Sequence, residues 1–171
     1  MNLHMITTKK GLSKIDSTIL AEYILQKTGS MSHLKLQKVL YYIQALHLAY
    51  FNEPLIDDEF EAWLHGPVSR KIYDELKDKS ILYKELAYKA EEGVETPNEI
   101  IEKSLTPDQK ELVDEIISEY GKLSASKLEA ISHGEDPWIN ARKGYSDSDR
   151  CCVIITKKSM MEYYHKELYE K

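Results

Sequence analysis

The hydrophobic residues of this chain recur mostly at helical spacing. Residues 16–28 carry them between Asp16, a candidate N-cap, and Gly29, a candidate helix stop, which predicts an amphipathic helix. Residues 32–50 carry a broader apolar stripe, which predicts a helix close to the centre of the core. The remaining face of this second helix is predicted to carry its polar side chains: Lys35, Lys38, Gln44 and His47.

The helical period breaks after this segment. Turn-forming residues and loose alternation of apolar and polar positions predict a small β-hairpin at residues 54–64. Gly66 permits an unusual backbone angle. Pro67 suits the first position of a following helix, because that position leaves its backbone N–H unpaired and proline has none. A β-branched run makes residues 152–155 a candidate third strand that pairs with the hairpin.

The pattern in the second half of the chain predicts further helices. A capping box with proline in the first turn starts a helix at Thr106, and Gly121 ends it. A short helix is expected at residues 124–133, and another follows the β-branched run. Residues 81–88 fit either a helix or an extended segment, and residues 91–98 read as a polar connection. These elements predict a mainly α, single compact domain of six or seven helices with a small antiparallel β-hairpin, or three short strands.

Composition narrows the class of protein. A chain of 171 residues suits one domain, and its net charge of −6 argues against binding nucleic acid or an anionic membrane. The only cysteines, Cys151 and Cys152, are neighbours and cannot cross-link distant segments. The start of the chain lacks a signal-peptide pattern, and no apolar run is long enough to span a membrane. We therefore expect a reduced, cytoplasmic protein.

Residues that could carry chemistry have simpler structural explanations. His133, Glu135 and Asp136 lie close together but lack the spacing of a metal site, and a helix stop at Gly134 accounts for them. Nothing near the cysteines in sequence would activate a thiol, and there is no phosphate-binding loop. We expect no metal, no cofactor and no catalytic residue, and therefore no enzyme.

Three motifs occur in a distinctive order along the chain. They are Lys35–Tyr42 (KLQKVLYY), Trp63–Val68 (WLHGPV) and His133–Trp138 (HGEDPW), followed by a helix with Ile155, Met160, Tyr163 and Tyr164. This series resembles the Panacea domain, the SocA-like antitoxin family, over residues 14–166. The resemblance implies a domain at 14–171 after an N-terminal extension at 1–13. Its motif residues are read as scaffold: Lys35, Leu36, Gln37, Lys38, Tyr41, Gly66, Pro67, His133, Pro137 and Trp138.

The resemblance implies an antitoxin, a small protein that binds and neutralises a cognate protein toxin. Stoichiometric, noncatalytic binding is the function we expect. One alternative is a proteolytic adaptor that also docks an ATP-dependent protease, and another is an enzyme acting on the toxin or on a small molecule. Candidate partner-binding residues lie where the second helix, the hairpin and the third helix should converge: Tyr42, Gln44, His47, Trp63, His65 and Tyr73. The competing interpretation of the second helix is a core helix with no contact to a partner.

Overall fold

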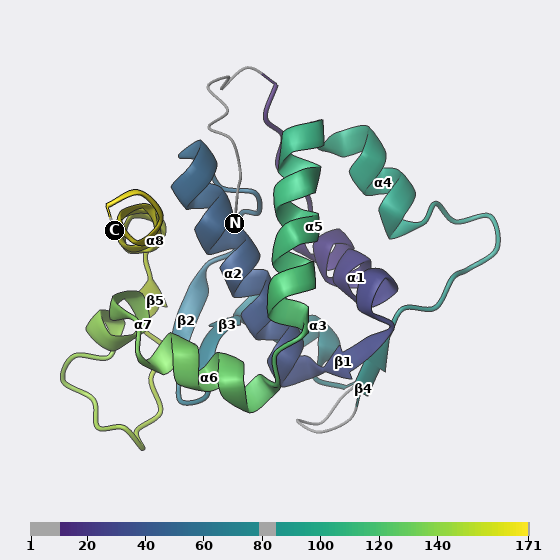
Figure 1. The fold of residues 1–171 in the computed structure, drawn as a ribbon. Coiled ribbons are helices and arrows are strands. Elements are labelled where there is room, and N and C mark those ends of the chain that lie inside the picture. The colour runs from purple at the N-terminus through teal and green to yellow at the C-terminus, as the bar shows by residue number, and fades with distance from the viewer. Residues whose placement is uncertain (1–10, 79–84, 171) are drawn as a thin grey trace.

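The computed structural model describes residues 11–78 and 85–170, which form eight helices and two small sheets (Figure 1). Helix α1 (Ser17–Thr28) begins after Asp16, whose carboxylate accepts a hydrogen bond from the Thr18 N–H at 2.8 Å. Helix α2 (His33–Phe51) begins after Ser32, whose hydroxyl accepts one from the Lys35 N–H at 3.2 Å. Both predicted helices are confirmed, and so is the mainly α fold.

Helix α2 lies at the centre of the core. It is packed by α1, α5 (Pro107–Gly121), α6 (Ala125–His133) and α8 (Lys157–Tyr169), which surround it in Figure 1. Fifteen of its 19 residues are buried, so the prediction of a polar outer face was wrong. Lys38, Gln44 and His47 are each 0% exposed and find polar partners inside the fold instead.

The three-stranded sheet has the order β3-β2-β5, and both of its pairings are antiparallel. Strands β2 (Phe60–Trp63) and β3 (Gly66–Ser69) form the hairpin, which lies later in the chain than the predicted residues 54–64. Leu55 and Ile56 are buried but outside any strand. Strand β5 (Ile154–Ile155) pairs with Phe60 and Glu61, so the candidate third strand is confirmed.

Pro67 was predicted at a helix start, and this was wrong. It lies in β3 opposite Ala62, and β3 is an edge strand, where a residue without an N–H is tolerated. Helix α3 (Arg70–Leu76) begins three residues later, after Ser69, whose hydroxyl accepts a hydrogen bond from the Ile72 N–H at 3.2 Å. The whole WLHGPV motif therefore belongs to the hairpin.

Three elements, one strand and two helices, were not predicted. Strand β1 (Ser30–Ser32) pairs with β4 (Glu85–Ala87) in a second, antiparallel sheet, so residues 85–87 of the segment predicted as either helix or extended are extended. Helix α4 (Pro97–Ser104) begins with a capping box between Thr96 and Glu99, within the segment read as a polar connection. Helix α7 (Asp136–Ala141) has six residues and contains the proline and tryptophan of the third motif.

Parts of two predictions lie outside the described residues. These are residues 1–10 of the predicted N-terminal extension and residues 81–84 of the segment read as either helix or extended. Over the ranges that are described, no helix combines the length and apolar character needed to cross a bilayer.

Candidate partner-binding site

The six candidate partner-binding residues separate into an interior group and a surface group. Tyr42, Gln44 and His47 are each 0% exposed, so the expectation that the polar side chains of α2 reach outward is wrong for them. Trp63 and Tyr73 are half-buried and His65 is exposed. The surface group alone can meet a partner in this conformation.

The surface group lines an apolar pocket of about 90 Å³ between α2, the hairpin and α3. The Tyr73 ring meets the edge of Trp63, with centroids 4.8 Å apart, and stacks on His33 at 5.7 Å. Convergence of these three elements was predicted, and the structure confirms this placement. Sequence reasoning missed five of the lining residues, which lie on α2 and on the hairpin: His33, Leu34, Gln37, Leu64 and Val68.

A salt bridge orients Trp63 at the edge of this pocket. The Arg70 guanidinium lies 5.1 Å from the Trp63 ring and donates two hydrogen bonds to Glu61, at 2.8 and 2.9 Å. The Trp63 indole N–H donates to the same carboxylate at 2.5 Å. Partial burial raises the pKa of Glu61, but these donors outweigh it and hold that pKa below its usual value. Trp63 is therefore restrained before any partner arrives.

The scaffold motifs meet behind the hairpin. Lys38 donates to the His65 carbonyl, and the Trp138 indole donates to the Trp63 carbonyl at 2.9 Å. Gly66 has φ +110°, and a Cβ there would lie 3.0 Å from the Lys38 ammonium nitrogen. Burial lowers the pKa of Lys38 to about 8. The motifs thus join α2, the hairpin and α7 into one unit.

A second polar cluster lies between α2, α7 and α8. The Tyr42 hydroxyl donates to the Glu135 carboxylate, and the Tyr164 hydroxyl donates to that of Tyr41 at 3.3 Å. Burial raises the pKa of Glu135, although the hydrogen bond from Tyr42 opposes the rise. Because these groups are interior, we assign them to the scaffold.

The residues considered for metal or thiol chemistry are separated by the fold. Glu135 faces Tyr42, while the His133 ring stacks on Trp138 with centroids 3.9 Å apart. Within residues 11–78 and 85–170, no three His, Cys, Asp or Glu side chains are grouped as metal ligands would be. Cys151 is buried, whereas Cys152 is exposed, with its sulfur 3.6 Å from the Arg70 guanidinium.

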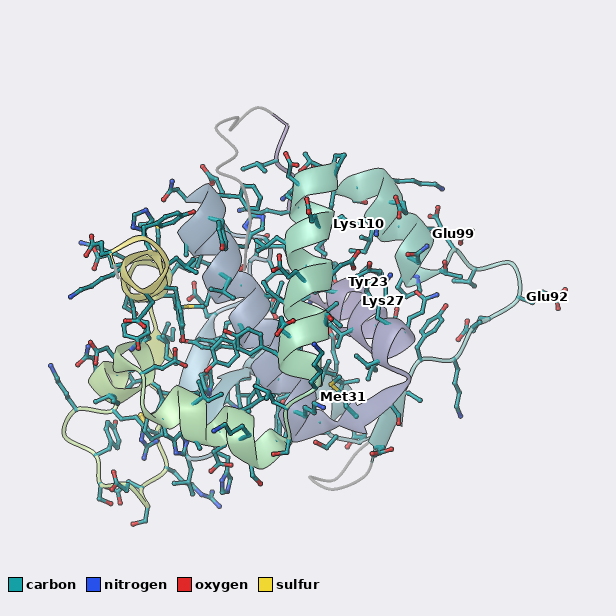
Figure 2. The ribbon with its side chains drawn as sticks, in the orientation of Figure 1. Tyr23, Lys27, Met31, Glu92, Glu99 and Lys110 are labelled. Carbon is teal, nitrogen blue, oxygen red and sulfur yellow. The ribbon has the colours of Figure 1, made fainter. Side chains whose placement is uncertain are left out.

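A larger and more open hollow of about 830 Å³ lies between α4 and α5. Figure 2 labels Lys110 there, on α5 beside α4, and this lysine is paired with Asp114 at 2.8 Å and Glu102 at 3.3 Å. Tyr23 of α1 donates a hydrogen bond to the same Asp114. Four carboxylates against one lysine make the lining acidic, and it lacks the grouped aromatic side chains of the hairpin pocket.

Comparison with known proteins finds relatives of this chain. The family model described as "Antitoxin SocA-like, Panacea domain" matches residues 36–139. Antitoxin SocA from Caulobacter vibrioides (strain NA1000 / CB15N) is 29% identical over 132 residues, which cover 72% of this chain and 69% of that protein. No solved structure matches the chain.

Proposed function

Since the chain belongs to the SocA-like antitoxin family, defined by the Panacea domain, we propose that it neutralises a protein toxin by stoichiometric, noncatalytic binding. The family supports an antitoxin role, and with it a toxin partner. The observation that carries the binding mechanism is the apolar pocket that Trp63, His65 and Tyr73 form with neighbouring residues of the hairpin and of α2. A toxin side chain seated there would anchor the complex.

The pocket has the properties of an interface centre. Binding energy at protein interfaces is concentrated in a few tryptophan, tyrosine and arginine side chains around a desolvated pocket. Trp63 and Tyr73 line the pocket with their rings in contact, and the Arg70 guanidinium lies over the Trp63 ring beside it. Little side-chain entropy is therefore lost when a partner binds. The pocket volume of about 90 Å³ suits a single apolar side chain.

Co-expression with the candidate toxin tests the antitoxin role. The product of the neighbouring gene is expressed alone and together with this chain, and growth is measured. Arrest by the first and rescue by the pair supports the proposal. Calorimetric titration of the purified proteins should then saturate at a fixed stoichiometry. Rescue by a substoichiometric amount of this chain would point to an enzyme. Toxin loss that requires an added ATP-dependent protease would point to an adaptor.

Two substitutions test the pocket itself. Trp63→Ala and Tyr73→Ala should each weaken toxin binding by about 10- to 100-fold, because truncating a central aromatic residue costs about 1.5–3 kcal/mol. Tyr145→Ala is the matched control, since Tyr145 is 44% exposed and lies outside the pocket. Equal affinities for the three variants would show that the toxin binds elsewhere.

A further inference from the structure

Three backbone carbonyls in and beside the hairpin turn accept hydrogen bonds from buried side chains outside the hairpin. The Arg142 guanidinium donates to Ala62 at 2.9 Å, and the Trp138 indole donates to Trp63 at 2.9 Å. Lys38 donates to His65. The three donors come from α2, from α7 and from the residue that caps the end of α7. The turn at Leu64 and His65 is thus held from behind along its length.

Burying Lys38 to hold the turn carries a desolvation cost. It is 0% exposed, and lysine is almost never fully buried unless it is paired with an acid. Its one hydrogen-bond acceptor is the His65 carbonyl, and no carboxylate lies within ion-pairing distance of its ammonium among the described residues. A hydrophobic residue of similar length would avoid the desolvation cost. Stability alone therefore does not account for a lysine at this position.

The surroundings of Lys38 are shaped to let it reach the turn. Gly66 has no side chain, and a Cβ there would lie 3.0 Å from the Lys38 nitrogen and 3.1 Å from the Ser132 hydroxyl. The φ of +110° at Gly66 is also strained for any other residue. The glycine and the lysine therefore fit each other and together define one conformation of the turn.

We propose that Lys38 is a positioning residue for partner binding, holding the Leu64-His65 turn in the conformation that completes the pocket. This inference rests on the proposed function, because it assigns the hairpin turn to toxin recognition. A turn that is already ordered in the free protein does not have to be ordered on binding. Lys38 therefore acts on affinity through the His65 carbonyl, without touching the toxin.

A pair of lysine variants isolates this effect. Lys38→Met removes the donor to the turn while keeping a side chain of similar length. Lys35→Met is the matched control, because Lys35 lies on the same helix and donates to a backbone carbonyl as well, that of Gly121, at 2.6 Å. We expect Lys38→Met to weaken toxin binding about tenfold or more, and Lys35→Met to leave it within about twofold.

Hydrogen exchange supplies a readout that needs no toxin. The chain has two tryptophans, so the indole region of a ¹⁵N correlation spectrum contains two N–H signals. The Trp138 indole N–H should exchange slowly, because it donates to the Trp63 carbonyl. Its exchange should become at least about tenfold faster in Lys38→Met and stay unchanged in Lys35→Met. If Lys38→Met does not fold, Lys38→Gln, with a shorter neutral donor, takes its place.

The two readouts separate the possible failures. Unchanged Trp138 exchange in Lys38→Met would overturn the inference, because the lysine would not hold the turn. The inference would also be overturned if Trp138 exchanged faster in Lys38→Met while that variant bound the toxin as tightly as Lys35→Met does. The lysine would then order the turn without affecting binding. Unchanged toxin binding by Trp63→Ala would refute the proposed site instead, whatever the exchange rates are.

Discussion

His47 should make the stability of this protein depend on pH in a defined window. Its Nδ1 lies 2.6 Å from the Glu53 carbonyl and its Nε2 lies 3.0 Å from the Gln109 amide nitrogen. The Gln109 oxygen already accepts hydrogen bonds from Ser13 and Thr106, so its amide group faces His47 as a donor. The neutral imidazole therefore donates at Nδ1 and accepts at Nε2. Protonation would destroy the second interaction.

The size of this effect follows from the pKa of His47. Burial lowers that pKa from 6.5 to about 4. Between these values the unfolded chain binds a proton that the folded chain does not, so the free energy of unfolding falls as the pH falls. A shift of about 2.5 units corresponds to about 3.4 kcal/mol, and about 3 kcal/mol of it is lost between pH 7 and pH 4. The side chain is 0% exposed, so solvent screening does not reduce this figure.

Urea unfolding of the wild type and of His47→Gln at several pH values measures this loss of stability. Other groups titrate in this range, but they are common to both proteins and cancel in the difference between the two unfolding free energies. The amount by which the unfolding free energy of the wild type exceeds that of His47→Gln should be about 3 kcal/mol smaller at pH 4 than at pH 7. A difference that stays constant with pH would refute the assignment of a buried, neutral histidine.

Three further substitutions test other parts of the scaffold. Gly66→Ala should lower the free energy of unfolding by about 1–3 kcal/mol through the strained φ and the contact with Lys38, as thermal or urea unfolding would reveal. Glu135→Gln should gain stability relative to the wild type as the pH rises above 4.5, because burial raises the pKa of the folded carboxyl and its ionisation then opposes folding; parallel pH profiles would contradict this. Gln44→Leu should cost about 3 kcal/mol or more in urea unfolding, because its amide satisfies the backbone of Leu55 and Ile56; a loss below about 1 kcal/mol would mean that these groups find other partners.

Helix starts were predictable because their signals are local. Asp16, Ser32, Thr106 and Ser124 each cap a helix through a hydrogen bond to a backbone N–H two or three residues later. The pairing of β1 with β4 joins strands of three residues that lie more than 50 positions apart, and nothing local specifies it. Periodicity was equally uninformative about α7, whose six residues make less than two turns.

Only the surface group of the candidate site could be predicted, because its residues are close together in the sequence. Trp63 in β2, His65 in the hairpin turn and Tyr73 in α3 lie close together in the chain, so short connections bring them together. The burial of Gln44 and His47 depends on partners from other parts of the chain, and helical periodicity does not reveal how many sides of a helix are covered. His33 reaches the pocket at the start of α2, where its ring stacks on that of Tyr73 from α3, and no local sequence signal predicts this contact.

The enclosure of α2 has a consequence for the speed of folding. Helical proteins usually fold fast because most of their contacts are local. Here the central helix completes its packing with segments from both sides of it in the chain, such as α8, whose Tyr164 bonds Tyr41 from 123 residues away. The long loop between two such segments must close before the contacts that stabilise it can form. The protein should fold more slowly than its helix content suggests, and that delay sets how soon a newly made chain reaches its native state.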